Sequence, residues 1–215
     1  MKRKICGLLA ALSLCLAASS EAANNDFQLW TELKYAHPFG KSPWTLLWAT
    51  ENRFADNASR YDLFNTTVGF DYRVFKWFKP AFFYRAEKPD GKPWENRLIP
   101  QVEFIGRLGV AEFINRQRFE VRFFPDETRF RYRSRFRMGF PIKSKPVSFT
   151  PYIQDEIFYE PTNGGFNRNR LDGGNSFGFL GGKITFDLFY RLQLDQASPD
   201  WTKRHILGTS LGFKY

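Results

Sequence analysis

A run of alternating arginines in residues 129–140 is the part of the sequence best suited to charge chemistry. Positions 129, 131, 133, 135 and 137 are all arginine, and most of the positions between them are aromatic or apolar. Side chains of a β-strand point to opposite faces with a period of two. A strand would therefore align five guanidinium groups on one face, where they can bind anions or the carboxylates of neighbouring strands.

The preceding segment adds three more arginines on one face, with Glu120 between the last two, and we predict one basic ladder from the two segments. Two roles are open for it. The ladder can form the selectivity lining of a pore that prefers anions, or it can form an interior network of salt bridges with acidic side chains. Its predicted members are Arg116, Arg118, Arg122, Arg129, Arg131, Arg133, Arg135 and Arg137, and its predicted acidic partners are Glu103, Glu120, Glu156 and Asp187.

Other residues give little indication of a catalytic or metal site. The chain contains two histidines, His37 and His205, which is few for a transition-metal site. Ser210 lies five residues after His205, and this spacing puts the two side chains on opposite faces of a strand. More distant pairs, such as Ser134 or Ser176 with His205, stay open. We predict no catalytic residue, no metal and no cofactor, with a lipid-modifying enzyme as a lesser alternative.

Residues 1–22 have the pattern of a secretory signal peptide. A basic head is followed by a short apolar stretch and a small-residue cleavage site after Ala22. Both cysteines, Cys6 and Cys15, lie in this segment, so the mature domain 23–215 is predicted to have no disulfide and no thiolate site. Removal of three lysine or arginine residues and one glutamate lowers the net charge from +10 to +8.

The mature chain alternates apolar and polar residues over segments typical of β-strands. Asp155 falls among the apolar positions of its segment, which indicates a bulge there. No apolar stretch after the signal is long enough for a transmembrane helix. The predicted strands are 27–35, 44–54, 61–73, 78–88, 97–108, 113–124, 129–140, 149–160, 168–179, 183–193 and 205–215.

These features predict an all-β fold, a transmembrane antiparallel up-and-down β-barrel in the bacterial outer membrane. Such barrels face apolar residues to lipid and polar residues inward, and they alternate short and longer connections. The aromatic content of 19% suits lipid-facing strands and interface girdles. Single-chain bacterial barrels have an even number of strands. We therefore expect ten or twelve strands, with 27–35 as the weakest of the eleven segments.

Six short stretches of the mature chain carry a resemblance to a known family: 26–30, 56–60, 95–97, 155–158, 165–171 and 207–209. Through them the mature chain resembles the domain-of-unknown-function 2490 family of predicted bacterial outer-membrane barrels. The resemblance implies fold and location, and it supplies no activity or catalytic residue. The end of the chain, Phe213-Lys214-Tyr215, also resembles the aromatic signature that such barrels present to their insertion machinery.

The expected function is a narrow channel with an arginine-lined, anion-favouring lumen, and the alternative is a non-conducting structural barrel. The alternative has support because small barrels fill their interiors with side chains. A barrel that binds lipopolysaccharide through basic loop residues, including Lys92, Arg97, Arg168 and Arg170, is a further possibility. Expected partners are outer-membrane lipid, lipopolysaccharide and the barrel insertion machinery, with no nucleic acid. The sequence leaves the solute and the oligomeric state open.

Overall fold

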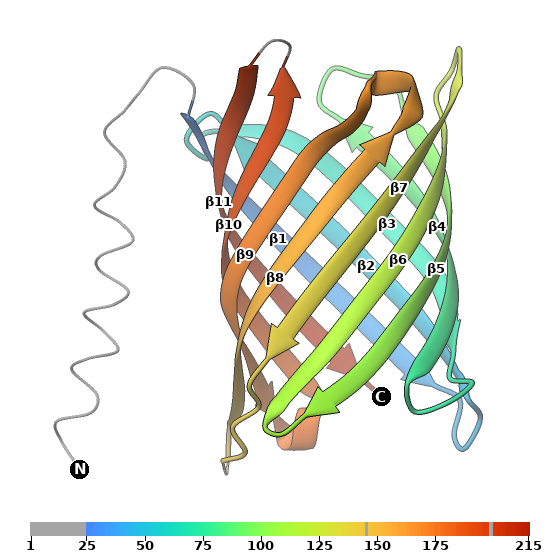
Figure 1. Ribbon diagram of the computed structural model, residues 1–215, viewed down its shortest axis with the longest axis vertical. Coiled ribbons are helices and arrows are strands. Elements are labelled where there is room, and N and C mark those ends of the chain that lie inside the picture. The colour runs from blue at the N-terminus through green and yellow to red at the C-terminus, as the bar shows by residue number, and fades with distance from the viewer. Residues whose placement is uncertain (1–24, 145, 198–199) are drawn as a thin grey trace, which may run out of the picture.

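The chain forms a closed barrel of eleven tilted strands, as seen in a computed structural model (Figure 1). The structure describes residues 25–144, 146–197 and 200–215, and the predicted signal peptide 1–22 lies outside them. No helix among the described residues is long and apolar enough to cross a membrane. The strands are β1 (Asn25–Pro38), β2 (Trp44–Ala55), β3 (Arg60–Tyr72), β4 (Phe78–Pro89), β5 (Glu95–Leu108), β6 (Ala111–Phe123), β7 (Thr128–Gly139), β8 (Ser148–Glu160), β9 (Gly165–Phe179), β10 (Ile184–Ala197) and β11 (Asp200–Lys214), with short 3₁₀ turns at Pro161–Asn163 and Leu180–Gly182.

All eleven predicted segments fall on strands, and the expectation of ten or twelve strands was wrong. An even number follows only if every neighbouring pair is antiparallel. Here β1 and β11 close the barrel in parallel, with a register that runs from Asn25 opposite Lys203 to Ala36 opposite Lys214. Each connection reverses the chain, so an odd number of strands leaves the first and last pointing the same way. Segment 27–35, the weakest of the predicted strands, is thus part of a full strand, β1. We call its parallel pairing with β11 the parallel seam.

The parallel seam places the start of β1 and the end of β11 at opposite ends of the barrel (Figure 1). We call the end that holds Asn25 and the β2–β3, β4–β5, β6–β7 and β8–β9 connections the N-terminal rim, and the opposite end the C-terminal rim. Successive strands are separated by two to five residues at the N-terminal rim and by two to eight residues at the C-terminal rim. The expected alternation of short and longer connections is therefore absent.

The barrel has an inverted polarity: apolar side chains lie outside and charged side chains lie inside, the reverse of a water-soluble protein. Large apolar groups on the outer face are open to the surroundings: Phe82 is 53% exposed and Ile153 is 54% exposed. Charged groups on the inner face are covered, and Glu120 is 0% exposed. Strand alternation produces this sorting because successive residues point to opposite faces of the wall.

The bulge predicted at Asp155 is absent. Asp155 stays in register with Phe136 on β7 and Leu171 on β9, and it accepts a hydrogen bond of 2.8 Å from Asn169 Nδ2. The register shifts in β8 occur instead between Phe158 and Tyr159. The carboxylate of Asp155 therefore remains on the apolar outer face, next to an amide that satisfies it.

Glycines on the inner face of β9 and β11 make room for an inward aromatic ring of β10. A Cβ atom built on Gly208 would lie 2.0 Å from Phe189 Cζ. A Cβ atom on Gly174 would lie 2.7 Å from the backbone oxygen of Leu188 and 2.6 Å from Phe189 Cβ. Because backbone atoms cannot rotate away, the glycine at position 174 is required by close approach of the two strands.

We predict that Gly174→Ala lowers the stability of the barrel by about 1–3 kcal/mol, the range for overpacking. Gly173→Ala is the matched control, because the neighbouring glycine has no atom within 4 Å of its built Cβ. Thermal unfolding followed by circular dichroism measures both variants. Equal melting temperatures for the two would contradict the packing described for β9 and β10.

Candidate functional site

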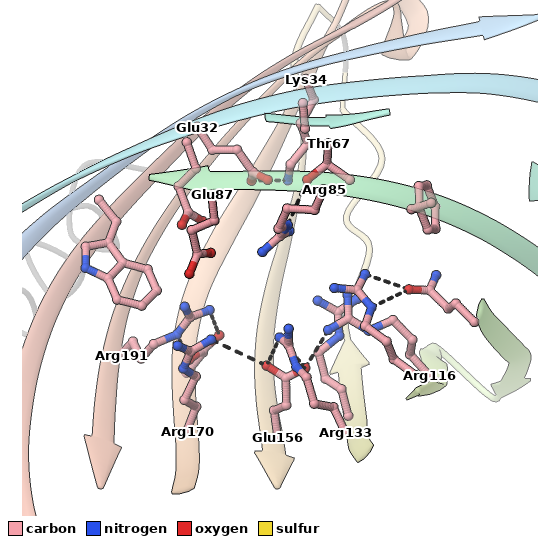
Figure 2. Close-up of a pocket in the computed structure, with 18 of the residues that line it drawn as sticks. Glu32, Lys34, Thr67, Arg85, Glu87, Arg116, Arg133, Glu156, Arg170 and Arg191 are labelled. Atoms are coloured by element: carbon pink, nitrogen blue, oxygen red, sulfur yellow. Dashed lines mark hydrogen bonds and ion pairs between the residues drawn. The ribbon is translucent and has the colours of Figure 1, made fainter. Parts of the chain in front are cut away.

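A cavity of about 920 Å³ fills the barrel interior and is lined by residues from both ends. Phe124 and Arg129 line it at the N-terminal rim, and Lys183 and Lys214 line it at the C-terminal rim. Figure 2 shows acidic and basic side chains that point toward this space from opposite walls, with Arg85 facing a row that includes Glu156. The cavity is therefore a charged space that extends along the barrel.

The predicted arginines are brought together by the register of β6 and β7. Arg116 lies opposite Arg135, and Arg118 lies opposite Arg133. Every predicted arginine lines the cavity. Like charges directly opposite each other on neighbouring strands are destabilising, so this wall requires carboxylates from other positions to hold it together.

Glu120 is one of the two carboxylates that hold the wall together. It is fully buried, and Arg131 Nε donates to its Oε2 at 2.8 Å. Arg133 donates to its other oxygen, also at 2.8 Å. Arg97 of β5 approaches to 3.8 Å. One carboxylate thus balances part of the charge of three arginines on two strands, β5 and β7.

Glu156 of β8 is the second shared carboxylate. Arg133 donates from one terminal nitrogen to both of its oxygens at 2.9 Å, and Arg116 donates at 2.5 Å. Arg170 of β9 lies 3.9 Å away. Glu156 is 2% exposed, and its interactions join β6, β7, β8 and β9 into one network.

The network extends to residues outside the predicted set. Arg97 donates to Glu95 at 2.5 Å and also to Glu87. Arg122 connects them to the predicted ladder by a 2.6 Å bond to Glu95. Alternation within segment 78–88 already placed Glu87 on the polar face, whereas Glu95 lies just before predicted segment 97–108. Glu95 was omitted because the predicted strand begins two residues later than β5 does.

A second group of ion pairs lies across β9 and β10. Arg191 Nε donates to Asp172 at 2.7 Å, and a terminal nitrogen donates at 2.8 Å. Arg170 donates to Gln193 at 2.7 Å. The alternation of Arg168, Arg170 and Asp172 in the sequence was the signal for this group, but the surrounding glycines weakened the strand pattern.

Two predicted acidic partners do not pair with the arginine ladder. Glu103 lies on the cavity wall, but its ion pair is with Lys79 at 3.0 Å. Asp187 pairs with Lys34 at 3.8 Å on the other side of the barrel.

At the N-terminal rim, the hydrogen bond donated by Arg129 lowers the pKa of the exposed Glu127 carboxyl group.

Several inward cations are left without a close carboxylate. Arg118 donates to the amide oxygen of Gln101 at 2.6 and 2.9 Å. Arg137 stacks on Tyr152 at 3.7 Å. Within the ranges that the structure describes, Arg135 has no ion pair within 4.0 Å and no hydrogen bond. The interior therefore carries an excess of positive charge.

His205 and Ser210 are separated by the wall of the barrel. His205 lies on the outer face, where its Nδ1 is 2.5 Å from the hydroxyl of Tyr190. Ser210 faces inward and is buried. The two side chains therefore lie on opposite faces, as their spacing predicted.

The basic residues proposed for loop contacts with lipopolysaccharide are also placed differently from the prediction. Arg97 belongs to β5, and both Arg168 and Arg170 belong to β9. All three line the interior cavity. The prediction that they are loop residues was wrong: β5 begins at Glu95 and β9 begins at Gly165, so all three residues lie within strands. Lys92 alone of the four lies in a connection between strands.

We predict that Glu120→Gln lowers the free energy of unfolding by on the order of 3 kcal/mol, because it removes the buried carboxylate closest to Arg131 and one of the two that bind Arg133. Glu127→Gln removes an acid that pairs with Arg129 at the exposed rim, and such surface pairs contribute little. Denaturant unfolding of both variants provides the comparison. If Glu120→Gln is as stable as Glu127→Gln, the buried network does not hold β6 and β7 together.

Comparison with known proteins confirms the family resemblance. A family model described as "Protein of unknown function (DUF2490)" matches residues 27–204, which includes all or part of every strand. No curated protein and no solved structure gives a significant match.

Proposed function

Because the chain belongs to the DUF2490 family of proteins of unknown function, we propose its role from its own geometry: an outer-membrane barrel with a narrow passage that favours anions. The observation that carries this proposal is the cavity lined by residues from both rims and by an excess of arginines. The proposal has three parts, which are the bilayer location, the passage and the preference for anions.

The inverted polarity supports a bilayer location. Outward apolar side chains such as Val68, Phe82 and Phe136 are more than 40% exposed, and in water such a continuous apolar surface drives association. The opposite arrangement, with arginine on the outside, would cost ~2–4 kcal/mol per residue at the bilayer midplane. Trp44 and Trp77 near one rim and Trp94 near the other suit the two interfaces of a membrane.

The size of the cavity supports a passage for small solutes. Spread over the ~30 Å hydrocarbon thickness of a bilayer, 920 Å³ corresponds to a mean cross-section of about 30 Å². A space of this mean cross-section suits water and small ions better than large solutes. Cations on the wall, among them Arg118, Arg135 and Arg137, favour anions within it.

A non-conducting barrel is the second candidate, and the burial of the network favours it. Glu120, Glu156 and Arg133 are all less than 10% exposed, so they are packed against other side chains. In this role the arginines hold the barrel together, and lipid or lipopolysaccharide on the outside would be its natural surroundings. Conductance separates the two candidates.

We predict that the purified protein, reconstituted in a planar bilayer, conducts small ions and selects anions. The zero-current potential in a potassium chloride gradient measures the selectivity. Arg135→Glu should weaken or reverse the preference, because it changes a cavity cation that has no ion-pair partner. Arg107→Glu is the matched control: it makes the same charge change in β5 outside the cavity lining. A wild-type protein without conductance would support the non-conducting candidate.

We also predict that the two rims face opposite sides of the outer membrane, with the C-terminal rim toward the periplasm. The predicted mature chain has no cysteine, so single cysteines can report each side. Asp126→Cys at the N-terminal rim should react with an impermeant maleimide in intact cells, and Lys76→Cys at the C-terminal rim should react only after permeabilisation. Equal labelling of both in intact cells would contradict a spanning barrel.

A further inference from the structure

We propose that Arg116, Arg118 and Arg135 form a binding site for a tetrahedral oxyanion, inorganic phosphate or a phosphate monoester, inside the barrel. This inference deepens the proposed anion passage by naming a site and a ligand class within it. The site lies on the wall made by β6 and β7, where the three side chains line the cavity.

The strand register brings the three guanidinium groups to one place. Arg116 and Arg135 are directly opposite each other, and side chains at such positions begin ~4.5–5.5 Å apart. Arg118 follows two residues later on the same face of β6. Figure 2 shows Arg116 and Arg133 on this side of the cavity and Arg85 pointing in from the opposite wall. Three neighbouring positions thus present cations to the same region of the cavity.

The nearby carboxylates are engaged by other cations. Glu156 is held by Arg133 through both of its oxygens at 2.9 Å, and it offers one oxygen to Arg116. Glu103 is held by Lys79 at 3.0 Å. Arg118 reaches a carboxylate only at 4.0 Å, on Glu120. Among the residues that the structure describes, no carboxylate within hydrogen-bond distance therefore balances the charge of Arg118 or Arg135.

Hydrogen-bond donors in the same place are buried without acceptors. Arg116 Nε and Arg135 Nε are both inaccessible and have no hydrogen-bond partner in the described chain. Arg116 is 8% exposed, so its Nε–H lacks the solvent contact that would satisfy it. A buried donor without an acceptor costs free energy, and two such donors on facing arginines indicate that an acceptor belongs between them.

A tetrahedral oxyanion fits these donors better than a carboxylate or a halide. The planar fork of a guanidinium group binds two oxygens of a phosphate at once. A phosphate can accept from Arg116, Arg118 and Arg135 on different oxygens, and its second negative charge offsets more than one cation. The repulsion that Arg118 receives from Arg116, Arg133 and Arg85 would be relieved most by a doubly charged ligand.

Isothermal titration of the purified, detergent-solubilised protein with inorganic phosphate tests the site, with acetate at equal ionic strength as the comparison. We expect phosphate to bind and acetate to bind at least ten-fold more weakly. Arg135→Gln and Arg118→Gln should each weaken phosphate binding by at least ten-fold. Arg129→Gln is the matched control, because it removes the same charge from the same strand at a position whose ion pair is at the rim.

Melting temperature provides a second readout that separates binding from folding. Arg135→Gln removes an unpaired cation that faces Arg116, so without phosphate it should melt at or above the wild-type temperature. Phosphate should raise the melting temperature of the wild type and of Arg129→Gln, and leave Arg135→Gln unchanged. The site is overturned if phosphate binds Arg135→Gln as it binds the wild type, or if acetate and phosphate bind alike.

The outcome for this site is independent of the outcome for conductance. A barrel that conducts anions but binds no phosphate would overturn the site and leave the proposed passage in place. A barrel that binds phosphate through Arg135 and conducts nothing would overturn the passage and leave a phosphate-binding barrel.

Discussion

The buried attraction between a few carboxylates and many guanidinium groups is the interaction on which the barrel interior depends. Charged groups out of water are tolerated only when oppositely charged partners and hydrogen bonds replace their hydration. Glu120 and Glu156 supply those partners for arginines on β5, β6, β7 and β9. Because each carboxylate serves several cations, the network is cooperative, and the positions of its members are set jointly.

The shortage of carboxylates gives the interior its functional character. A barrel wall in which every base contacted one acid would carry no net charge. Here the register puts Arg116 opposite Arg135 and Arg118 opposite Arg133, so repulsion is built into the fold. Such an arrangement persists only because the strands on either side hold the wall in place, and it leaves donors directed toward the cavity.

The two sides of the barrel are packed by different means. On β5 to β8, long charged side chains fill the interior. On β9 to β11, inward glycines admit the ring of Phe189 between Gly174 and Gly208, and this brings the strands close together. The parallel seam of β1 and β11 lies beside this second side. Charged side chains of other strands, among them Glu51, Arg85 and Arg191, also line the cavity. The wall formed by β6 and β7 differs from the rest by its row of arginines.

The strands, the faces of their side chains and the family could be predicted from the amino-acid sequence, because alternation along a strand is a local property that each segment carries independently. Arg131, Arg133 and Glu120 could be placed on inward faces for the same reason. The number of strands and the parallel seam emerge from the folded barrel, since closure depends on which strand meets β1 after all the others have paired. The partners emerge there too: Glu103 faces Lys79 and Asp187 faces Lys34, whereas Arg135 has no carboxylate in contact among the described residues. Pairing depends on register between distant strands, and register is a property of the closed sheet rather than of any one segment.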